Sequence, residues 1–314
     1  MIVRRFLLRR FISAVLSLIG ATFIVFVISI GADDPLLLYA KPGGYGVSPE
    51  QVQALKEKLG LDKPIVVQYT LWFARAAKGD LGKSIFDERD VSKKIAERIG
   101  ATLKLGVASW IFATLLGVPL GVLAAVKRGS GWDYLGRFVA LFGQAIPNFW
   151  LGIVLVLIFT VRLDWLPSST AGEGFISIKH MIMPVVVLGT STAAGYLRIT
   201  RSAMLEVLDA EFIKLARSKG VGNSLIVWKH AFRNALIPPL TVSAILLTGF
   251  ITGSVVTETV FAWPGLGRLA VDSVAANDFP LVTGITLIFV AAWVLMNFAA
   301  DLMYAIVDPR IRLS

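Results

Sequence analysis

The sequence predicts an all-α polytopic membrane protein with six transmembrane helices. Of its 314 residues, 56% are hydrophobic and only 17% are charged, whereas soluble domains carry about 25% charged residues. The mean hydropathy is +0.73. The apolar residues also come in long runs, and a bilayer core takes roughly 20 residues of helix to cross. We therefore expect lipid as the solvent and a single transmembrane domain over residues 1–314.

Six apolar runs are long enough to span. They cover residues 11–30, 102–126, 134–161, 181–199, 235–257 and 281–307. Lys and Arg near the ends of the runs predict their orientation, because cytoplasmic loops are enriched in both. The N-terminal segment contains Arg4, Arg5, Arg9 and Arg10. The two short outer loops contain only Arg162, Lys179 and Arg268. Both termini are therefore expected in the cytoplasm.

The composition also excludes several functions. The formal net charge is +10, but the cations flank apolar runs, which is typical of membrane topology and not of a nucleic-acid-binding face. The chain has no cysteine and only two histidines, His180 and His230, so thiolate chemistry is excluded and no metal site is expected. We find no nucleophile or acid–base constellation that would indicate an enzyme.

The first outer loop, residues 31–98, is expected to fold. An amphipathic stretch over 65–78 ends at Gly79 and contains aromatic residues suited to an interface. Gly82-Lys83-Ser84 resembles the end of a phosphate-binding loop, but Ala77 stands where that pattern needs glycine. The loop is either a cap over the outer mouth or a surface for an external partner, and its composition favours neither.

The cytoplasmic loop over 200–234 predicts a short docking helix. Asp209 is a suitable N-cap, the helix is expected from Ala210 to Lys219, and Gly220 and Gly222 end it. Phe212, Leu215 and Ala216 recur at helical spacing and form an apolar face. A helix this short is marginal in water, so that face should be buried. It lies either against the headgroups or its own bundle, or in a groove of a partner protein.

Polar side chains inside the predicted spans are candidates for a pathway. Small and hydroxyl residues in spans also serve helix packing, which is the alternative for each of them. The candidates are Gln144, Asn148, Thr248, Thr252, Ser254 and Thr257. Asp301 in the last span is the one carboxylate that an ion-coupled mechanism could use, but it has no His, Lys or Glu partner within the spans.

Several segments resemble binding-protein-dependent ABC importers, and in particular permeases of the dipeptide/oligopeptide/nickel family. The matching segments are 211–220 (EFIKLARSKG), 230–238 (HAFRNALIP), 59–64 (LGLDKP), 79–84 (GDLGKS), 258–267 (ETVFAWPGLG) and 308–312 (DPRIR). One departure stands out: the general Glu-Ala-Ala hallmark reads Lys214-Leu215-Ala216 here. Glu211, one turn earlier, is therefore the weakest member of the coupling loop.

The resemblance implies a type I ABC importer permease in a bacterial or archaeal inner membrane. Its expected partners are a second homologous permease, two cytoplasmic ATPases and an external substrate-binding protein. ATP and Mg²⁺ would bind the ATPases, with no cofactor on this chain. The residues expected to couple to the ATPases are Glu211, Phe212, Leu215, Ala216, Arg217, Gly220 and Gly222. Those expected to contact the binding protein are Glu258, Trp263, Arg268 and Asp272.

The cargo stays open at this point. Di- and oligopeptides are implied first, and nickel chelates, glutathione or sugars are alternatives within the same architecture. The rival from another class is a secondary transporter driven by an ion gradient, which would work without ATPases.

Overall fold

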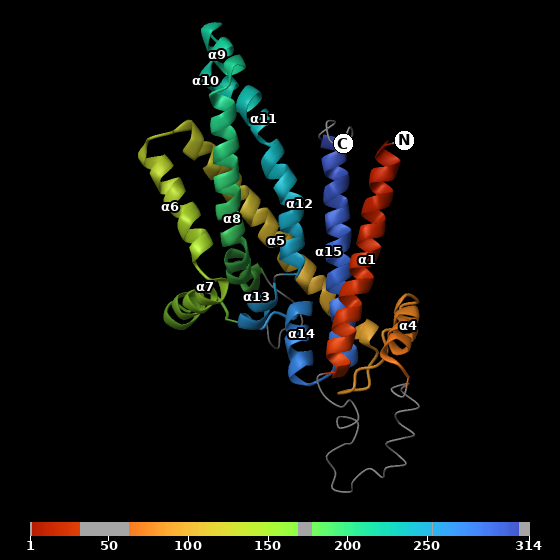
Figure 1. Cartoon of the computed structure of the whole chain (residues 1–314). Coiled ribbons are helices and arrows are strands. Elements are labelled where there is room, and N and C mark those ends of the chain that lie inside the picture. The colour runs from red at the N-terminus through yellow and green to blue at the C-terminus, as the bar shows by residue number, and fades with distance from the viewer. Residues whose placement is uncertain (1, 32–62, 169–177, 253, 308–314) are drawn as a thin grey trace, which may run out of the picture.

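The structure is a computed structural model that describes residues 2–31, 63–168, 178–252 and 254–307 (Figure 1). The long helices are α1 (Ile2–Gly31), α5 (Val91–Val126), α6 (Gly131–Ala145), α8 (Ile178–Leu208), α12 (Ile237–Thr252) and α15 (Phe279–Val307). The shorter ones are α4 (Ile65–Ala76), α7 (Asn148–Leu155), η1 (Val156–Arg162), α9 (Glu211–Ser218), α10 (Asn223–Leu225), η2 (Ile226–Phe232), α11 (Arg233–Ala235), α13 (Val255–Val260) and α14 (Leu266–Ala275). Every regular element in these ranges is a helix, which confirms the predicted all-α class.

The long helices form a bundle with two distinct ends. Figure 1 shows α9 and α10 at the same end as the start of α1 and the end of α15. We call this the inner end, following the predicted orientation. Helices α4 and α14 lie at the opposite, outer end. The helix termini thus agree with the expectation that both ends of the chain lie on one side, although the side itself remains a prediction.

Four described helices are long and apolar enough to cross a membrane, or five if α6 and the segment after it count as one broken span. The span predicted over 134–161 is broken, since the chain bends by 100° between Ala145 and Asn148. Ile146 and Pro147 have extended backbone angles there. Proline lacks the N–H that would continue the helix and disfavours helical angles in the residue before it.

The span predicted over 235–257 is also interrupted. Helix α12 ends at Thr252 and α13 begins at Val255. With 16 residues, α12 extends about 24 Å, which is shorter than the roughly 30 Å core of a bilayer. Six complete crossings therefore remain a prediction.

The core of the bundle is the contact between α5 and α8, which is more extensive than that of any other pair of described helices. A Cβ on Gly117 would lie 2.4 Å from the carbonyl oxygen of Ala193, and one on Gly121 would lie 2.8 Å from that of Leu197. Only glycine permits this approach, and small residues four apart are a common means of close helix packing in membranes.

The described part of the first outer loop, 63–98, is folded as predicted, and residues 32–62 lie outside the described residues. Tyr69 and Trp72 of α4 pack against Phe23 and Phe26 of α1. The hydroxyl of Tyr69 donates to the carbonyl of Ile19 over 3.0 Å. Helix α4 is therefore fastened to the outer half of α1.

The segment between α4 and α5 is fastened to the start of α15. Ser84 donates a hydrogen bond to the buried carboxylate of Asp278, which also accepts one from the backbone of Ile85 over 3.2 Å. Burial raises the pKa of nearby Asp87, but hydrogen bonds from Lys94 and from the backbone N–H of Arg89 oppose this, and that pKa lies below its usual value. Since Ser84 is occupied in this way, Gly82-Lys83-Ser84 is a structural turn, in agreement with the rejection of a phosphate loop.

Candidate functional site

The predicted docking helix exists as α9, which has eight residues. It is held to the bundle by Ile213, which is fully buried among Met204, Val227 and Ala231. Ala216 packs against the edge of the same cluster. One face of the helix thus packs against its own bundle, which was one of the two predicted alternatives. That face is centred on Ile213, a residue that the sequence did not single out.

The C-terminal end of α9 is closed by a Schellman motif. The N–H of Val221 donates to the carbonyl of Ala216 over 3.2 Å, and that of Gly220 donates to Arg217 over 3.0 Å. Gly220 has a φ of +78°, which glycine adopts without strain. The prediction that Gly220 ends the helix is confirmed. Gly222 comes after the motif and precedes α10 with an ordinary φ of −61°.

Two large apolar side chains of α9 point away from the bundle. Phe212 is 48% exposed and Leu215 is 56% exposed, beside an exposed Arg217. Glu211 is exposed as well and pairs with Lys214 of its own helix, over 2.7 Å, which is a weak interaction. The helix is therefore fixed to the bundle on one face and presents an exposed apolar edge on the other.

One predicted detail of this loop is wrong. Asp209 is not the N-cap: that residue is Ala210, which has no side-chain hydrogen bond to the helix, and the carboxylate of Asp209 pairs with Arg128 over 3.0 Å. The predicted apolar face is divided within this chain, since Phe212 points outward and Ala216 packs against the bundle. The pairing of Asp209 ties α9 to the turn after α5.

At the outer end, the segment after α12 folds around the buried carboxylate of Glu258. Its Oε1 accepts hydrogen bonds from Thr102 and Ser254, each over 2.8 Å. Its Oε2 accepts one from the backbone N–H of Arg268 over 3.0 Å. A Cβ on Gly265 would lie 2.4 Å from this carboxylate. Glycine is therefore required for the loop to close over Glu258.

The indole of Trp263 completes this loop. It is fully buried and donates to the carbonyl of Ala101 over 3.0 Å. Since Glu258 and Trp263 are both inside the protein, the expectation that they contact a binding protein is not met in this structure. Arg268 and Asp272 of α14 are partly exposed, and their contact with such a partner stays a prediction.

The predicted pathway residues do not form one described lining. Ser254 and Thr257 are buried, and Ser254 is bonded to Glu258. Gln144 is exposed and Asn148 half-buried, on either side of the bend after α6. The side chains of Thr248 and Thr252 lie outside the described residues. The role of all six as a lining therefore stays a prediction.

Two polar clusters were missed by the sequence reasoning. Fully buried Asp133 accepts from Arg201 over 2.7 Å and Arg137 over 2.6 Å, which joins α6 to α8. Ser243 of α12 receives hydrogen bonds from Trp110 and Tyr196, over 2.8 and 2.7 Å. Only the Asp133–Arg137 spacing of four residues is a local signal; the other partners are far apart in the sequence.

Comparison with known proteins identifies the class of protein that this bundle represents. Residues 117–313 match the family described as binding-protein-dependent transport system inner membrane component, and residues 3–106 match its N-terminal domain. The chain belongs to this family. It is thus a multi-pass inner-membrane component of a binding-protein-dependent transporter.

Individual relatives cover the whole length. The oligopeptide transport system permease protein AppB of Bacillus subtilis (strain 168) is 40% identical, over 98% of each chain. The dipeptide transport system permease protein DppB of Escherichia coli (strain K12) is 38% identical, also over 98% of each chain. An inward-facing structure of the MetNI methionine ABC transporter matches with a TM-score of 0.56 at 21% identity, over 68% of this chain and 96% of that one. The last likeness supports the type I importer fold alone.

Proposed function

We propose that this chain is one of two permease subunits of an ATP-driven importer for di- and oligopeptides. An external binding protein delivers the cargo, and two cytoplasmic ATPases, which carry ATP and Mg²⁺, drive transport. The chain has no ATPase site of its own. The names of the full-length relatives support peptides over nickel chelates or glutathione.

The observation that carries the coupling proposal is the division of α9 into two faces. Ile213 fixes the helix to the bundle, so a force on α9 reaches α8 and η2, which pack against the same cluster. Phe212 and Leu215 form the outward edge. An amphipathic helix edge of this kind fits a hydrophobic groove on a partner. We place the ATPase contact at Phe212, Leu215 and Arg217, whereas Ala216 belongs to the face that packs against the bundle.

The coupling proposal is tested by comparing substitutions on the two faces in the reconstituted transporter. Leu215→Ser, at the outward edge, should leave the chain as stable as the wild type but lower peptide-stimulated ATP hydrolysis and uptake at least tenfold. Ile213→Ala should instead lower the thermal stability of the chain, since removing a buried Ile side chain costs about 2–5 kcal/mol.

Glu211→Ser is the matched control, because the Glu211 side chain is 88% exposed and its ion pair with Lys214 is weak. It should leave uptake within about twofold of the wild type. Normal uptake by Leu215→Ser would rule out the outward edge as the coupling surface.

Uptake into lipid vesicles that contain the reconstituted transporter distinguishes an ATPase-driven permease from an ion-coupled transporter. Uptake should need hydrolysable ATP and persist when ionophores collapse the ion gradients. Uptake by this chain alone, lost in Asp301→Asn and indifferent to ATP, would instead establish the secondary transporter.

A further inference from the structure

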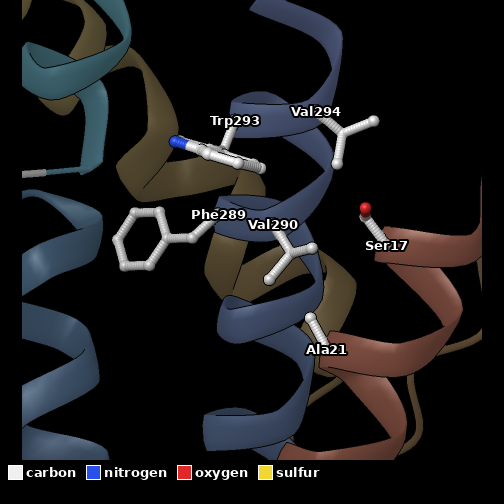
Figure 2. Close-up of a pocket in the computed structure, with 6 residues that line it drawn as sticks. All are labelled: Ser17, Ala21, Phe289, Val290, Trp293 and Val294. Carbon is white, nitrogen blue, oxygen red and sulfur yellow. The ribbon is translucent and has the colours of Figure 1, made fainter. Parts of the chain in front are cut away.

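A groove runs between α1 and α15 on the inner half of the molecule (Figure 2). At its outer end α1 is fastened by Tyr69 and Trp72 of α4. Toward the inner end, α1 and α15 diverge in Figure 1, and side chains from both helices line the space between them. The groove therefore results from the way α1 is mounted, tightly at one end and loosely at the other.

The part of the groove farther from the inner end is apolar and has a volume of about 280 Å³. Figure 2 shows Ser17 and Ala21 of α1 on the side of α15 where Val290 and Val294 lie, while Phe289 and Trp293 extend to the other side of α15. The lining residues on α15 are Phe289, Val290, Trp293 and Val294. Ser17 and Ala21 are one helical turn apart and lie on the same side of α1. Their small side chains leave the space open.

The part nearer the inner end has a volume of about 220 Å³ and a mixed lining that includes polar groups. Arg10, Ser13 and Asn297 contribute the polar groups. On α1 the residues Arg10, Ala14, Ser17 and Ala21 recur at helical spacing, so all four belong to one face. The groove thus changes from hydrocarbon-like to cationic along a single line toward the inner end.

We propose that this groove binds an anionic phospholipid of the cytoplasmic leaflet, with an acyl chain between Ser17 and Trp293 and the phosphate at Arg10. The apolar part of the groove corresponds to the acyl chain of such a lipid, and the cationic part, nearer the inner end, corresponds to its phosphate. A guanidinium has five N–H donors and pairs with phosphate in bidentate geometry, even when it serves another acceptor too. The sequence of the same segment also contains Arg4, Arg5 and Arg9, and basic pockets between helices on the cytoplasmic side favour anionic headgroups.

The proposal rests on the N-terminus being cytoplasmic but not on the identity of the cargo. A helix of the second permease is the other possible occupant. It would explain the apolar part of the groove but not the cationic part, and for this reason we favour the lipid.

Native mass spectrometry of the assembled transporter tests the headgroup site. The wild type should retain phosphatidylglycerol over phosphatidylcholine with identical acyl chains. Arg10→Gln should weaken retention of phosphatidylglycerol about fivefold, since one cation near the surface contributes about 1 kcal/mol. Arg9→Gln is the matched control: it removes the same charge one residue away, does not line the groove, and should have a clearly smaller effect. Equal retention of both lipids, or equal loss in the two variants, would overturn the proposal.

A phosphatidylglycerol with a photoreactive acyl chain tests the apolar part. It should label residues of α1 and α15 in the wild type. Labelling should fall at least fivefold in Ser17→Phe, because the phenyl ring fills the groove. It should not fall in Leu16→Phe, because Leu16 is exposed and does not line the groove. If Ser17→Phe prevents assembly with the second permease while Leu16→Phe assembles normally, the groove is a subunit interface and the lipid proposal is wrong.

Discussion

At the scale of single residues, two buried carboxylates connect segments that are distant in the sequence. Asp133 joins α6 to Arg201 of α8 near the inner end. Glu258 joins α13 to Thr102 of α5 and to the loop before α14 near the outer end. Both carboxylates have their hydrogen bonds satisfied, which burial of a charge requires. They are therefore parts of the scaffold.

Glu258→Ala should destabilise the protein strongly. It leaves the hydroxyls of Thr102 and Ser254 and the N–H of Arg268 without their acceptor, and each buried unsatisfied group costs about 1–3 kcal/mol. We expect thermal unfolding of the purified permease to shift down by several degrees. Asp272→Ala is the control, because Asp272 is 64% exposed, and it should shift the unfolding temperature little. If Glu258→Ala is stable and loses only the transfer of cargo from the binding protein, Glu258 contacts the binding protein and is not part of the scaffold.

At the scale of elements, α9 is a short helix whose stability depends on its ends and its anchor. Its exposed ion pair contributes little, while the Schellman motif and the burial of Ile213 hold it in place. The short segments around it include the π-helical η2, a type of turn often found at functional sites. The position of α9 is thus determined by its surroundings more than by helix propensity.

Substitutions at Gly220 and Gly222 can distinguish the effect of backbone conformation from that of side-chain packing in this loop. Apart from its own chain neighbours, no described residue has an atom within 4 Å of a Cβ added at Gly220 or Gly222, but of these two glycines only Gly220 has a positive φ. Gly220→Ala should cost about 1–2 kcal/mol and speed hydrogen exchange in the last turn of α9. Gly222→Ala should change neither. Similar exchange rates in the two variants would show that the left-handed conformation does not hold the helix end.

At the scale of the whole molecule, the bundle is polarised. One end contains α9 and the helix termini, and the other contains α4, α14 and the loop closed over Glu258 (Figure 1). A transporter that is driven from one side and loaded from the other needs such a division. The lipid groove on α1 and α15 would add a third surface, turned toward the membrane.

The absence of cysteine makes the orientation directly measurable. Single cysteines introduced as Phe86→Cys and Lys219→Cys both fall on exposed positions, at opposite ends of the bundle. A membrane-impermeant thiol reagent should label the first in intact spheroplasts and the second only after permeabilisation. The opposite result would reverse the predicted topology, and with it the leaflet assigned to the lipid.

The sequence by itself determined the helical membrane class, the approximate positions of four spans and the end of α9 at Gly220. These features depend on local composition and on single-residue backbone preferences, which can be read along the chain. Motifs spread over the chain also indicated the family, which the comparisons then confirmed.

Tertiary structure alone decided the rest. Ile213 and Phe212 are neighbouring apolar residues, and hydropathy cannot tell which faces the bundle and which faces outward. Residues 134–161 are apolar enough to cross straight, but the chain bends at Pro147. Glu258 is an acidic residue that would be expected on the surface, and it is buried because donors from residues 102, 254 and 268 converge on it. In each case the deciding partner lies far away in the sequence or on another element, and therefore leaves no local pattern.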